Sequence, residues 1–325
     1  MTSRRRMLSR YGRDSAHIAP TLATGVGSVE LANVVMTASG TSGHGAELDA
    51  YFPLARLGAV VVKSLAAEPW DGNPAPRLHE AGDAMLNSVG LQGPGVAAWL
   101  RDDLPPLQRA HARVVVSIWG RTVEDYEKAA LALSGCPDDV IAVEVNLSCP
   151  NLDGGAHLFA HDADATRAAI AAVTGALDRP VWAKLTAHVT DIVAIAAAAR
   201  DGGADAVTVT NTMLAMSIDP DTRAYRLGSG AGGGGLSGPA IHPVAVRAVH
   251  DVHRALPDLP IVGVGGVRTA EDAVELLLAG ASAVQVGTAT FADPRAPLRV
   301  LEELEGWCAG HGVRAVTELI GGAHG

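Results

Sequence analysis

Two lysines stand at the ends of long apolar runs in the sequence. Lys63 ends the run AVVVK, and Lys184 ends the run PVWAK. Burying an ammonium group is costly unless it meets an anion or hydrogen-bond acceptors, although a lysine at a strand end can also extend its stem to reach solvent. Because the two lysines occupy equivalent positions, we expect them to share an anionic ligand.

A cysteine follows another apolar run, in a polar setting. Cys149 lies within the segment NLSCPN at 146–151. A thiol at the mouth of a pocket can act as a base or a nucleophile, whereas a lone cysteine is more often inert packing. The polar neighbours favour a role for Cys149 as a base or a nucleophile. We interpret Cys136 and Cys308 as packing, because they fall in a helix-to-loop turn and in the last helix.

Two further apolar runs end in glycine. The segments GVGGV at 263–267 and VGTA at 286–289 each lead into a helical stretch. Exposed backbone N–H groups at the start of a helix bind phosphate, and glycine lets the phosphate approach. The two turns together predict a phosphorylated cofactor.

Eight strand-like runs recur along the chain, and most are apolar nearly throughout, which is typical of parallel strands buried on both faces. The runs are Val34–Ser39, Ala59–Leu65, Val114–Trp119, Ile141–Ser148, Pro180–Thr186, Ala206–Thr212, Pro260–Gly266 and Ala283–Ala289. Helical stretches lie between them, such as Val123–Leu133, Ala163–Leu177, Thr190–Gly202, Ile241–Leu256 and Ala270–Ala279. This alternation predicts an α/β fold, a (β/α)₈ TIM barrel. An open doubly wound sheet is the alternative, but eight strands without a GxGxxG turn after the first favour closure.

Every predicted strand ends in a polar residue or in glycine. The carboxyl ends of barrel strands converge on one rim, where active sites lie and where phosphate is often bound at strands 7 and 8. Eight such ends describe a lined pocket with hydrogen-bonding capacity. The ends are Ser39 and Gly40, Lys63 and Ser64, Ser117, Asn146 and Ser148, Lys184, Asn211 and Thr212, Gly265 and Gly266, and Gly287 and Thr288.

Two connections are long, residues 66–113 and 214–235. In a barrel both follow the carboxyl ends of strands, so we expect them to be active-site loops. The glycine run 232–235 is alternatively a flexible surface linker, because long loops are often mobile.

The composition excludes several classes of protein. A net charge of −10 argues against non-specific nucleic-acid binding, and no run reaches the roughly 18 apolar residues of a membrane span. The three cysteines suit neither a disulfide framework nor a metal site, so a reducing cytoplasm is the simplest setting. We expect residues 1–30 to form a partly disordered extension and residues 31–325 a single barrel domain.

Taken together, the chain resembles the class 1 dihydroorotate dehydrogenases from about Leu31 to Ile320. The order and spacing of the resembling segments agree with the family, and the set is highly specific although each segment is weak alone. The segments are TASGTSGHG (37–45), VKSL (62–65), GNPAPR (72–77), MLNSVGLQGPG (85–95), EVNLSCPN (144–151), AKLTAHVTDI (183–192), TNTM (210–213), GGLSGPAIHPVA (234–245), GVGGV (263–267) and GASAVQVGTATFADP (280–294).

The resemblance implies a barrel that binds FMN and oxidises dihydroorotate to orotate in pyrimidine synthesis. It also implies that Cys149 is the base, and the cysteine points to class 1, because class 2 members use serine. The sequence segments GLQGPG, GGLSGPA and NLDGGAH look closer to those of class 1B. In that class the catalytic subunit passes electrons to NAD through a partner carrying FAD and a 2Fe–2S cluster. We therefore expect a homodimer with such a partner, and class 1A, which reduces fumarate, is the alternative.

The resemblance also assigns the site residues by position. Cys149 would take a proton, and Lys184 would place its charge beside the reduced flavin. The substrate would be held by Lys63, Asn87, Val89, Gly90, Leu91, Asn146, Asn151, Asn211 and Thr212. FMN would be held by Ser39, Gly40, Lys63, Ser64, Ser117, Asn146, Lys184, Ser237, Gly238, Gly265, Gly266, Gly287 and Thr288. Two positions depart from the family, because Ser117 replaces an asparagine and Ala187 with His188 replaces a Pro-Asn pair.

Two other functions stay open from the sequence. A related FMN barrel acting on another pyrimidine, like the dihydropyrimidine dehydrogenases, would share the FMN residues and the cysteine. Its substrate would lack the carboxylate that Lys63 would offset. A barrel retained as a ligand-binding or scaffolding subunit would lack flavin, and the intact Cys149, Lys63 and Lys184 argue against it.

Overall fold

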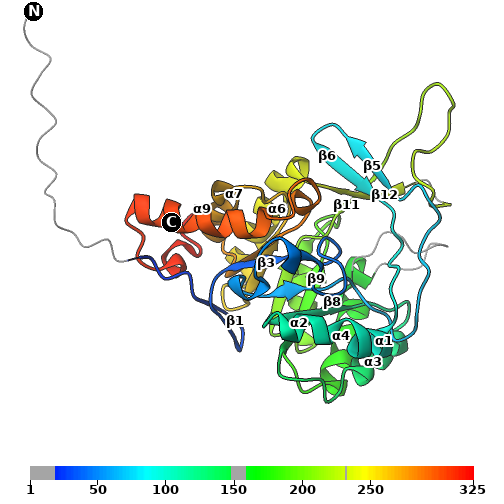
Figure 1. Ribbon diagram of the computed structural model, residues 1–325, viewed down its shortest axis with the longest axis horizontal. Helices are drawn as coiled ribbons and strands as arrows, with labels where there is room; N and C mark the ends of the chain where they lie inside the picture. The colour runs from blue at the N-terminus through cyan, green and yellow to red at the C-terminus, as the bar shows by residue number, and fades with distance from the viewer. Residues whose placement is uncertain (1–18, 148–158, 231–232) are drawn as a thin grey trace, which may run out of the picture.

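The computed structural model describes residues 19–147, 159–230 and 233–325, and its centre is a closed barrel of eight parallel strands (Figure 1). Around the barrel the strands follow the order β3-β14-β13-β10-β9-β8-β7-β4. A parallel bridge between Met36 and Ala59 closes it between the first and last strands of that order. The strands are β3 (Val35–Thr37), β4 (Val60–Val61), β7 (Val114–Ile118), β8 (Val140–Asn146), β9 (Val181–Leu185), β10 (Ala206–Val209), β13 (Ile261–Val264) and β14 (Ala283–Val286). The predicted (β/α)₈ TIM barrel is confirmed.

All eight predicted strands are present, and each one ends earlier than predicted. The strand expected to reach Thr212 stops at Val209, and the one expected to reach Leu65 stops at Val61. The strand interiors are buried, which explains their apolar runs. Most of the polar residues predicted at the strand ends follow the last paired residue, whereas Ser117, Asn146 and Lys184 are still paired within β7, β8 and β9.

Helices surround the barrel, and side-chain caps start several of them. Thr122, Asp162, Asp191 and Thr269 each accept a hydrogen bond from the backbone N–H three residues ahead, which satisfies a free donor of the first turn. The helices are α1 (Val96–Asp102), α2 (Leu104–Arg109), α3 (Val123–Ala132), α4 (Ala163–Ala176), α5 (Ile192–Asp201), α6 (His242–Ala255), α7 (Ala270–Leu278), α8 (Ala289–Ala292) and α9 (Ala296–His311), with the 3₁₀ turns η1 (Glu47–Ala50), η2 (Leu54–Arg56), η3 (Phe159–His161), η4 (Pro239–Ile241) and η5 (Val316–Leu319). The five predicted helices are confirmed with small differences at their ends. Within the three described ranges, no helix has the length and apolar character to cross a membrane.

A β-hairpin covers the end of the barrel opposite the rim. In it β1 (Thr24–Val26) pairs antiparallel with β2 (Val29–Leu31). The buried Val26 and Val29 pack with Trp182 and with other residues from the amino ends of the barrel strands. The boundary predicted at residue 31 therefore falls at the last residue of this hairpin. The described part of the predicted extension contains residues that pack against the barrel.

The two long connections meet in a second sheet at the rim. Its order is β11-β12-β6-β5, and all its pairs are antiparallel (Figure 1). The strands are β5 (Leu78–Ala81), β6 (Ala84–Asn87), β11 (Met213–Met216) and β12 (Gly233–Ser237). A Cβ atom on Gly234 would lie 2.4 Å from the carbonyl oxygen of Asn87, so β12 needs glycine where it crosses β6. The alternative of a flexible linker is therefore wrong for residues 233–235.

Candidate active site

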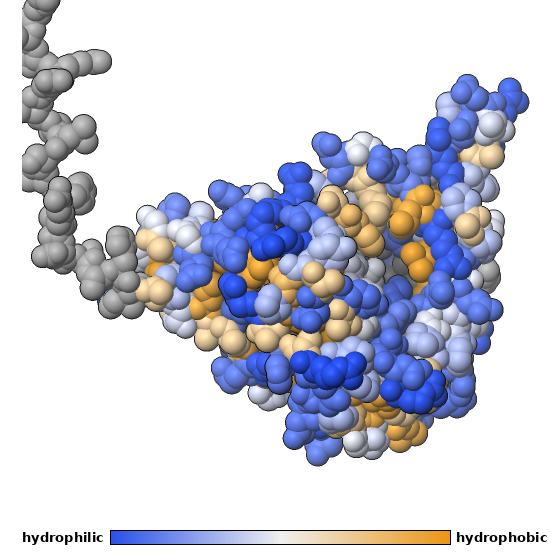
Figure 2. Space-filling model, in the orientation of Figure 1, coloured by the Kyte–Doolittle hydropathy of each residue, from blue (hydrophilic) through white to orange (hydrophobic). Residues whose placement is uncertain are grey.

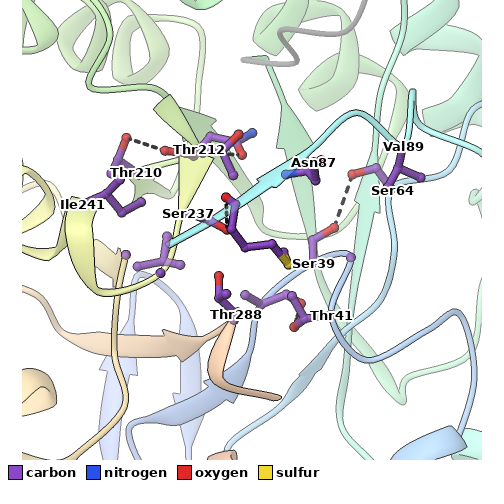
Figure 3. A pocket seen from close by; sticks show the side chains of 18 of the residues that line it. Ser39, Thr41, Ser64, Asn87, Val89, Thr210, Thr212, Ser237, Ile241 and Thr288 are labelled. Atoms are coloured by element: carbon purple, nitrogen blue, oxygen red, sulfur yellow. Dashed lines mark hydrogen bonds between the residues drawn. The ribbon is translucent and has the colours of Figure 1, made fainter. Parts of the chain in front are cut away.

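A cavity lies between the rim of the barrel and the second sheet (Figure 3). The empty space inside it, with the open mouth included, is about 990 Å³. Nearly all the predicted substrate and cofactor residues in the described ranges line it. These are Ser39, Gly40, Lys63, Ser64, Asn87, Val89, Gly90, Leu91, Asn146, Lys184, Asn211, Thr212, Ser237, Gly238, Gly265, Gly266, Gly287 and Thr288.

Three predicted site residues are not among the described residues of the cavity wall. Ser117 is fully buried and does not line the cavity. Cys149 and Asn151 lie outside the described residues. β8 ends at Asn146, three residues before Cys149 in the sequence.

The wall of the cavity also contains residues that sequence analysis missed. They are Ala38, Thr41, Leu78, Met85, Thr210, Ile241, Val264 and Phe291. Several adjoin a predicted residue in sequence, which was the available signal. Leu78 and Met85 had no such signal, because they reach the cavity only through the pairing of β5 and β6.

The cavity entrance is partly apolar. Leu78 of β5 and Phe291 of α8 line the cavity, and each is 50% exposed. Figure 2 shows apolar surface on the side of the second sheet, within a mainly hydrophilic exterior. Apolar side chains together with convergent polar groups are typical of a small-molecule binding site.

Hydrogen bonds between side chains order one wall of the cavity. The hydroxyl of Ser64 lies 3.2 Å from that of Ser39, as Figure 3 shows, and 2.9 Å from that of Ser117. Asn146 donates its amide to Ser64 at 3.3 Å, and Asn211 donates to the amide oxygen of Asn146 at 3.1 Å. Because each amide has a fixed partner, these asparagines are preorganised to offer a donor or acceptor to a ligand.

The loop Val89–Leu91 is held from its outer side. Trp70 donates its indole N–H to the carbonyl of Gly90 at 2.9 Å, and the backbone N–H of Asn73 donates to the carbonyl of Val89 at 3.0 Å. Gly90 and Leu91 both have positive φ angles, 72° and 62°. These contacts fix an unusual loop conformation that presents its inner side to the cavity.

The second predicted lysine forms a buried ion pair beneath the cavity. The ammonium Nζ of Lys184 lies 3.2 Å from Oε1 of Glu144, and the two side chains are 6% and 0% exposed. Gln285 and Thr208 complete this group by donating to the same carboxylate. These three partners were not predicted from the sequence, although a glutamate within the apolar run AVEVN was a usable signal of a buried charge.

The first lysine lies on the cavity wall against the backbone. A Cβ atom on Gly40 would lie 3.4 Å from Nζ of Lys63. The charge of Lys63 acts on the imidazole of His44. Burial of that imidazole lowers the pKa of His44. Lys63 adds to this lowering of the pKa, while Asp103 and Glu47 oppose it.

The two glycine turns form a cradle at the ends of β13 and β14. Gly265 has φ 141° and Gly266 has φ 73°, so both adopt backbone conformations that favour glycine. His242 fixes the first turn through its Nδ1, 2.7 Å from the carbonyl oxygen of Gly265. A Cβ atom on Gly287 would point toward the cavity residues Ala38 and Thr41, at 3.3 and 3.8 Å. Small, backbone-lined space of this kind fits a phosphate group.

The cysteines at 136 and 308 have the packing role expected of them. Both are buried free thiols. Burial raises the pKa of the Cys308 thiol, which keeps a thiol protonated and unreactive.

A protein-family model described as "Dihydroorotate dehydrogenase" matches residues 21–307. The "Dihydroorotate dehydrogenase B (NAD(+)), catalytic subunit" of Alkaliphilus metalliredigens is 47% identical over 296 residues, which cover 91% of this chain and 96% of that protein. The protein of the same name from Desulforudis audaxviator is also 47% identical, over 93% of this chain and 97% of its own length. That from Geobacter sp. strain M21 is 42% identical, over 93% and 98%. With the barrel, the lined cavity and these relatives in agreement, the chain belongs to the dihydroorotate dehydrogenase family of oxidoreductases.

Proposed function

We propose that this chain is the catalytic subunit of an NAD-linked, B-type dihydroorotate dehydrogenase, which oxidises dihydroorotate to orotate in pyrimidine synthesis. The relatives' shared name supports the proposal. The observation that carries it is one cavity lined by two lysines and three asparagines, namely Lys63, Lys184, Asn87, Asn146 and Asn211. Dihydroorotate has a ring with amide edges, which asparagines match because each offers a donor and an acceptor, and a carboxylate, which Lys63 would offset.

FMN is the flavin that the site fits. Gly265 and Gly287 both line the cavity, a Cβ atom on Gly287 would enter the space beside Ala38 and Thr41, and FMN carries a single phosphate. Ser39, Gly40 and Ser64 would hold its ring system from the opposite wall. The chemistry that FMN supplies when bound is acceptance of a hydride from the substrate.

The chain's own residues would divide the remaining work. Cys149 would take the proton from the substrate carbon next to a ring carbonyl. Lys184 would stabilise negative charge at the cavity floor. The hydrogen-bonded pair Asn146 and Asn211 would orient the pyrimidine ring, because the 3.1 Å bond between their amides fixes both side chains.

A partner subunit would complete electron transfer. The words "catalytic subunit" in the relatives' names imply a second, separate subunit. The three cysteines of this chain are too few and too scattered to bind an iron–sulfur cluster. We propose a homodimer of this chain joined by a subunit that carries FAD and a 2Fe–2S cluster and delivers the electrons to NAD.

The test of the chemistry uses the purified full chain. Denaturation should release FMN, and dihydroorotate should bleach the bound flavin under anaerobic conditions. Dihydrouracil should not bleach it, since it lacks the carboxylate for Lys63. Release of FAD alone, or of no flavin, contradicts the proposal, and bleaching by dihydrouracil instead favours a dehydrogenase of another pyrimidine.

The test of the partner uses the native cell. Co-purification should give a second subunit, together with FAD and iron. An isolated chain that reduces fumarate rapidly and co-purifies with nothing would be a class 1A enzyme instead.

A further inference from the structure

A polar layer fills the barrel directly beneath the cavity. Glu144, Thr208 and Gln285 lie on the alternate strands β8, β10 and β14, and each is fully buried. The interiors of such barrels are usually filled by branched apolar side chains, in layers contributed by alternate strands. A fully buried carboxylate in this layer therefore needs a physical explanation.

The two oxygens of the Glu144 carboxylate have different partners. Oε1 lies 3.2 Å from Nζ of Lys184. Oε2 accepts hydrogen bonds from Thr208 Oγ1 at 3.0 Å and from Gln285 Nε2 at 2.8 Å. Gln285 also turns its amide oxygen toward Nζ of Lys184, at 3.5 Å. The two neutral donors thus hold the carboxylate in the orientation that faces the lysine.

Lys184 connects this layer to the cavity. It lines the cavity from β9, and its side chain is only 6% exposed. Where water is excluded, charges are weakly screened and act strongly on one another and on a bound ligand. Glu144 therefore contributes, together with Lys184, to the charge that a ligand meets at the cavity floor.

We propose that Glu144 is a positioning residue that fixes the ammonium of Lys184 at the cavity floor and offsets part of its positive charge. Without this counter-ion, Lys184 would favour the anionic, reduced form of a flavin more strongly. Glu144 therefore limits how firmly the site retains electrons that must pass to the next acceptor. The flavin part of this inference rests on the proposed function, whereas the coupling of the two side chains does not.

The coupling is tested by urea unfolding of the full chain, freed of any bound flavin. Glu144→Gln removes the carboxylate that lies 3.2 Å from the buried ammonium of Lys184 and should lower the unfolding midpoint. The same substitution in a Lys184→Met background should lower it much less or raise it, because no ammonium remains to be balanced and the substitution removes a buried carboxylate that has lost this ammonium. A Glu144→Gln chain that fails to fold while the double variant folds gives the same support. Equal losses in both backgrounds overturn the pairing.

The charge balance is tested by comparing the affinity of each variant for reduced and oxidised FMN. Glu144→Gln should shift the ratio toward reduced FMN, on the order of tenfold for one weakly screened charge, and Lys184→Met should shift it toward oxidised FMN. Thr208→Val is the matched control, since it removes one donor to the same carboxylate but keeps the charge and the shape, and should change the ratio less than Glu144→Gln.

The sign of the shift decides between two roles. If Glu144 only anchored the lysine, Glu144→Gln would loosen Lys184 and move the ratio in the same direction as Lys184→Met, and that result overturns the charge balance. A wild-type chain that binds no FMN contradicts the proposed function and the flavin part with it, while the unfolding comparison still decides whether the two side chains are paired.

Discussion

The hydroxyl oxygens of Ser64 and Ser117 lie 2.9 Å apart, with Ser117 fully buried behind the cavity wall. Ser64 also contacts Ser39 and accepts a hydrogen bond from Asn146. Ser117 therefore acts on the cavity through Ser64, and any effect of Ser117 on a flavin would be indirect.

Ser117→Ala should lower the free energy of unfolding by about 0.5–1.5 kcal/mol, because one buried hydrogen bond is lost. The affinity for FMN should hardly change, since Ser64 keeps its bonds to Ser39 and Asn146. Denaturant unfolding and titration with FMN measure the two quantities. Ser64→Ala, which removes a cavity residue, is the comparison and should weaken FMN binding. Unchanged stability with a large loss of FMN affinity in Ser117→Ala would indicate a direct contact.

Lys63→Met should weaken the binding of orotate by roughly 10- to 150-fold, the worth of one charged hydrogen bond of about 1.5–3 kcal/mol. The measurement is the change in flavin absorbance as orotate is added. Lys128→Met is the matched control, because Lys128 is the remaining lysine of the chain and lies exposed on α3. Equal orotate affinity in the two variants would leave Lys63 with a structural role only.

Gly287→Ala should reduce the affinity for FMN about tenfold or more while the chain stays folded. The new Cβ atom would enter the space beside Ala38 and Thr41, where we place the phosphate, and overfilling a packed site costs about 1–3 kcal/mol. Gly306→Ala in α9 is the control, since a Cβ atom there meets nothing within 4 Å. That control should keep full FMN affinity and gain a little stability, as helix glycines do when replaced by alanine.

The chain should lose stability as the pH falls below about 6.5, and His44 should account for part of the loss. Burial lowers the pKa of His44 below its usual value of 6.5, with Lys63 adding to the effect. The folded state then binds fewer protons than the unfolded state between the two pKa values, so the stability is complete above the unfolded value and is lost as the pH falls through the folded one. His44→Gln should flatten the decline in unfolding free energy measured between pH 7 and about 5. An unchanged slope would assign the loss to other groups, such as His161 and His253, whose pKa values burial also lowers.

The barrel and its rim were predictable because they follow from local patterns. A strand buried on both faces must be apolar nearly throughout, as VVVSI in β7 is, and the polar or glycine residues at the strand ends mark the rim. The second sheet was not predictable in this way. β12 has the sequence GGGLS and pairs with β6 through Gly235 and Asn87, so pairing across more than a hundred residues stabilises it, and no local preference does.

The buried group around Glu144 shows a second limit of the sequence. A charged residue inside an apolar run indicates that a charge is buried at a cost in free energy. The run itself does not indicate which residue offsets that cost. Lys184, Thr208 and Gln285 come from three other strands and meet Glu144 only when the barrel closes. Lys184 was therefore predictable from its position at a strand end, and its partners were not.

Cys149→Ser should slow flavin reduction by dihydroorotate by about 10²–10⁴, the usual contribution of a general base. Serine keeps the shape of the side chain, but its hydroxyl barely ionises near neutral pH, so a partial recovery is expected as the pH rises. Binding of FMN and orotate should not change, because neither depends on the thiol. Cys136→Ser and Cys308→Ser are the controls, and since both thiols are buried, neither variant should alter the rate of single-turnover bleaching under anaerobic conditions. If Cys149→Ser bleaches at the wild-type rate while the controls behave as expected, a different group removes the proton, and the assignment of the base to the segment after β8 is wrong.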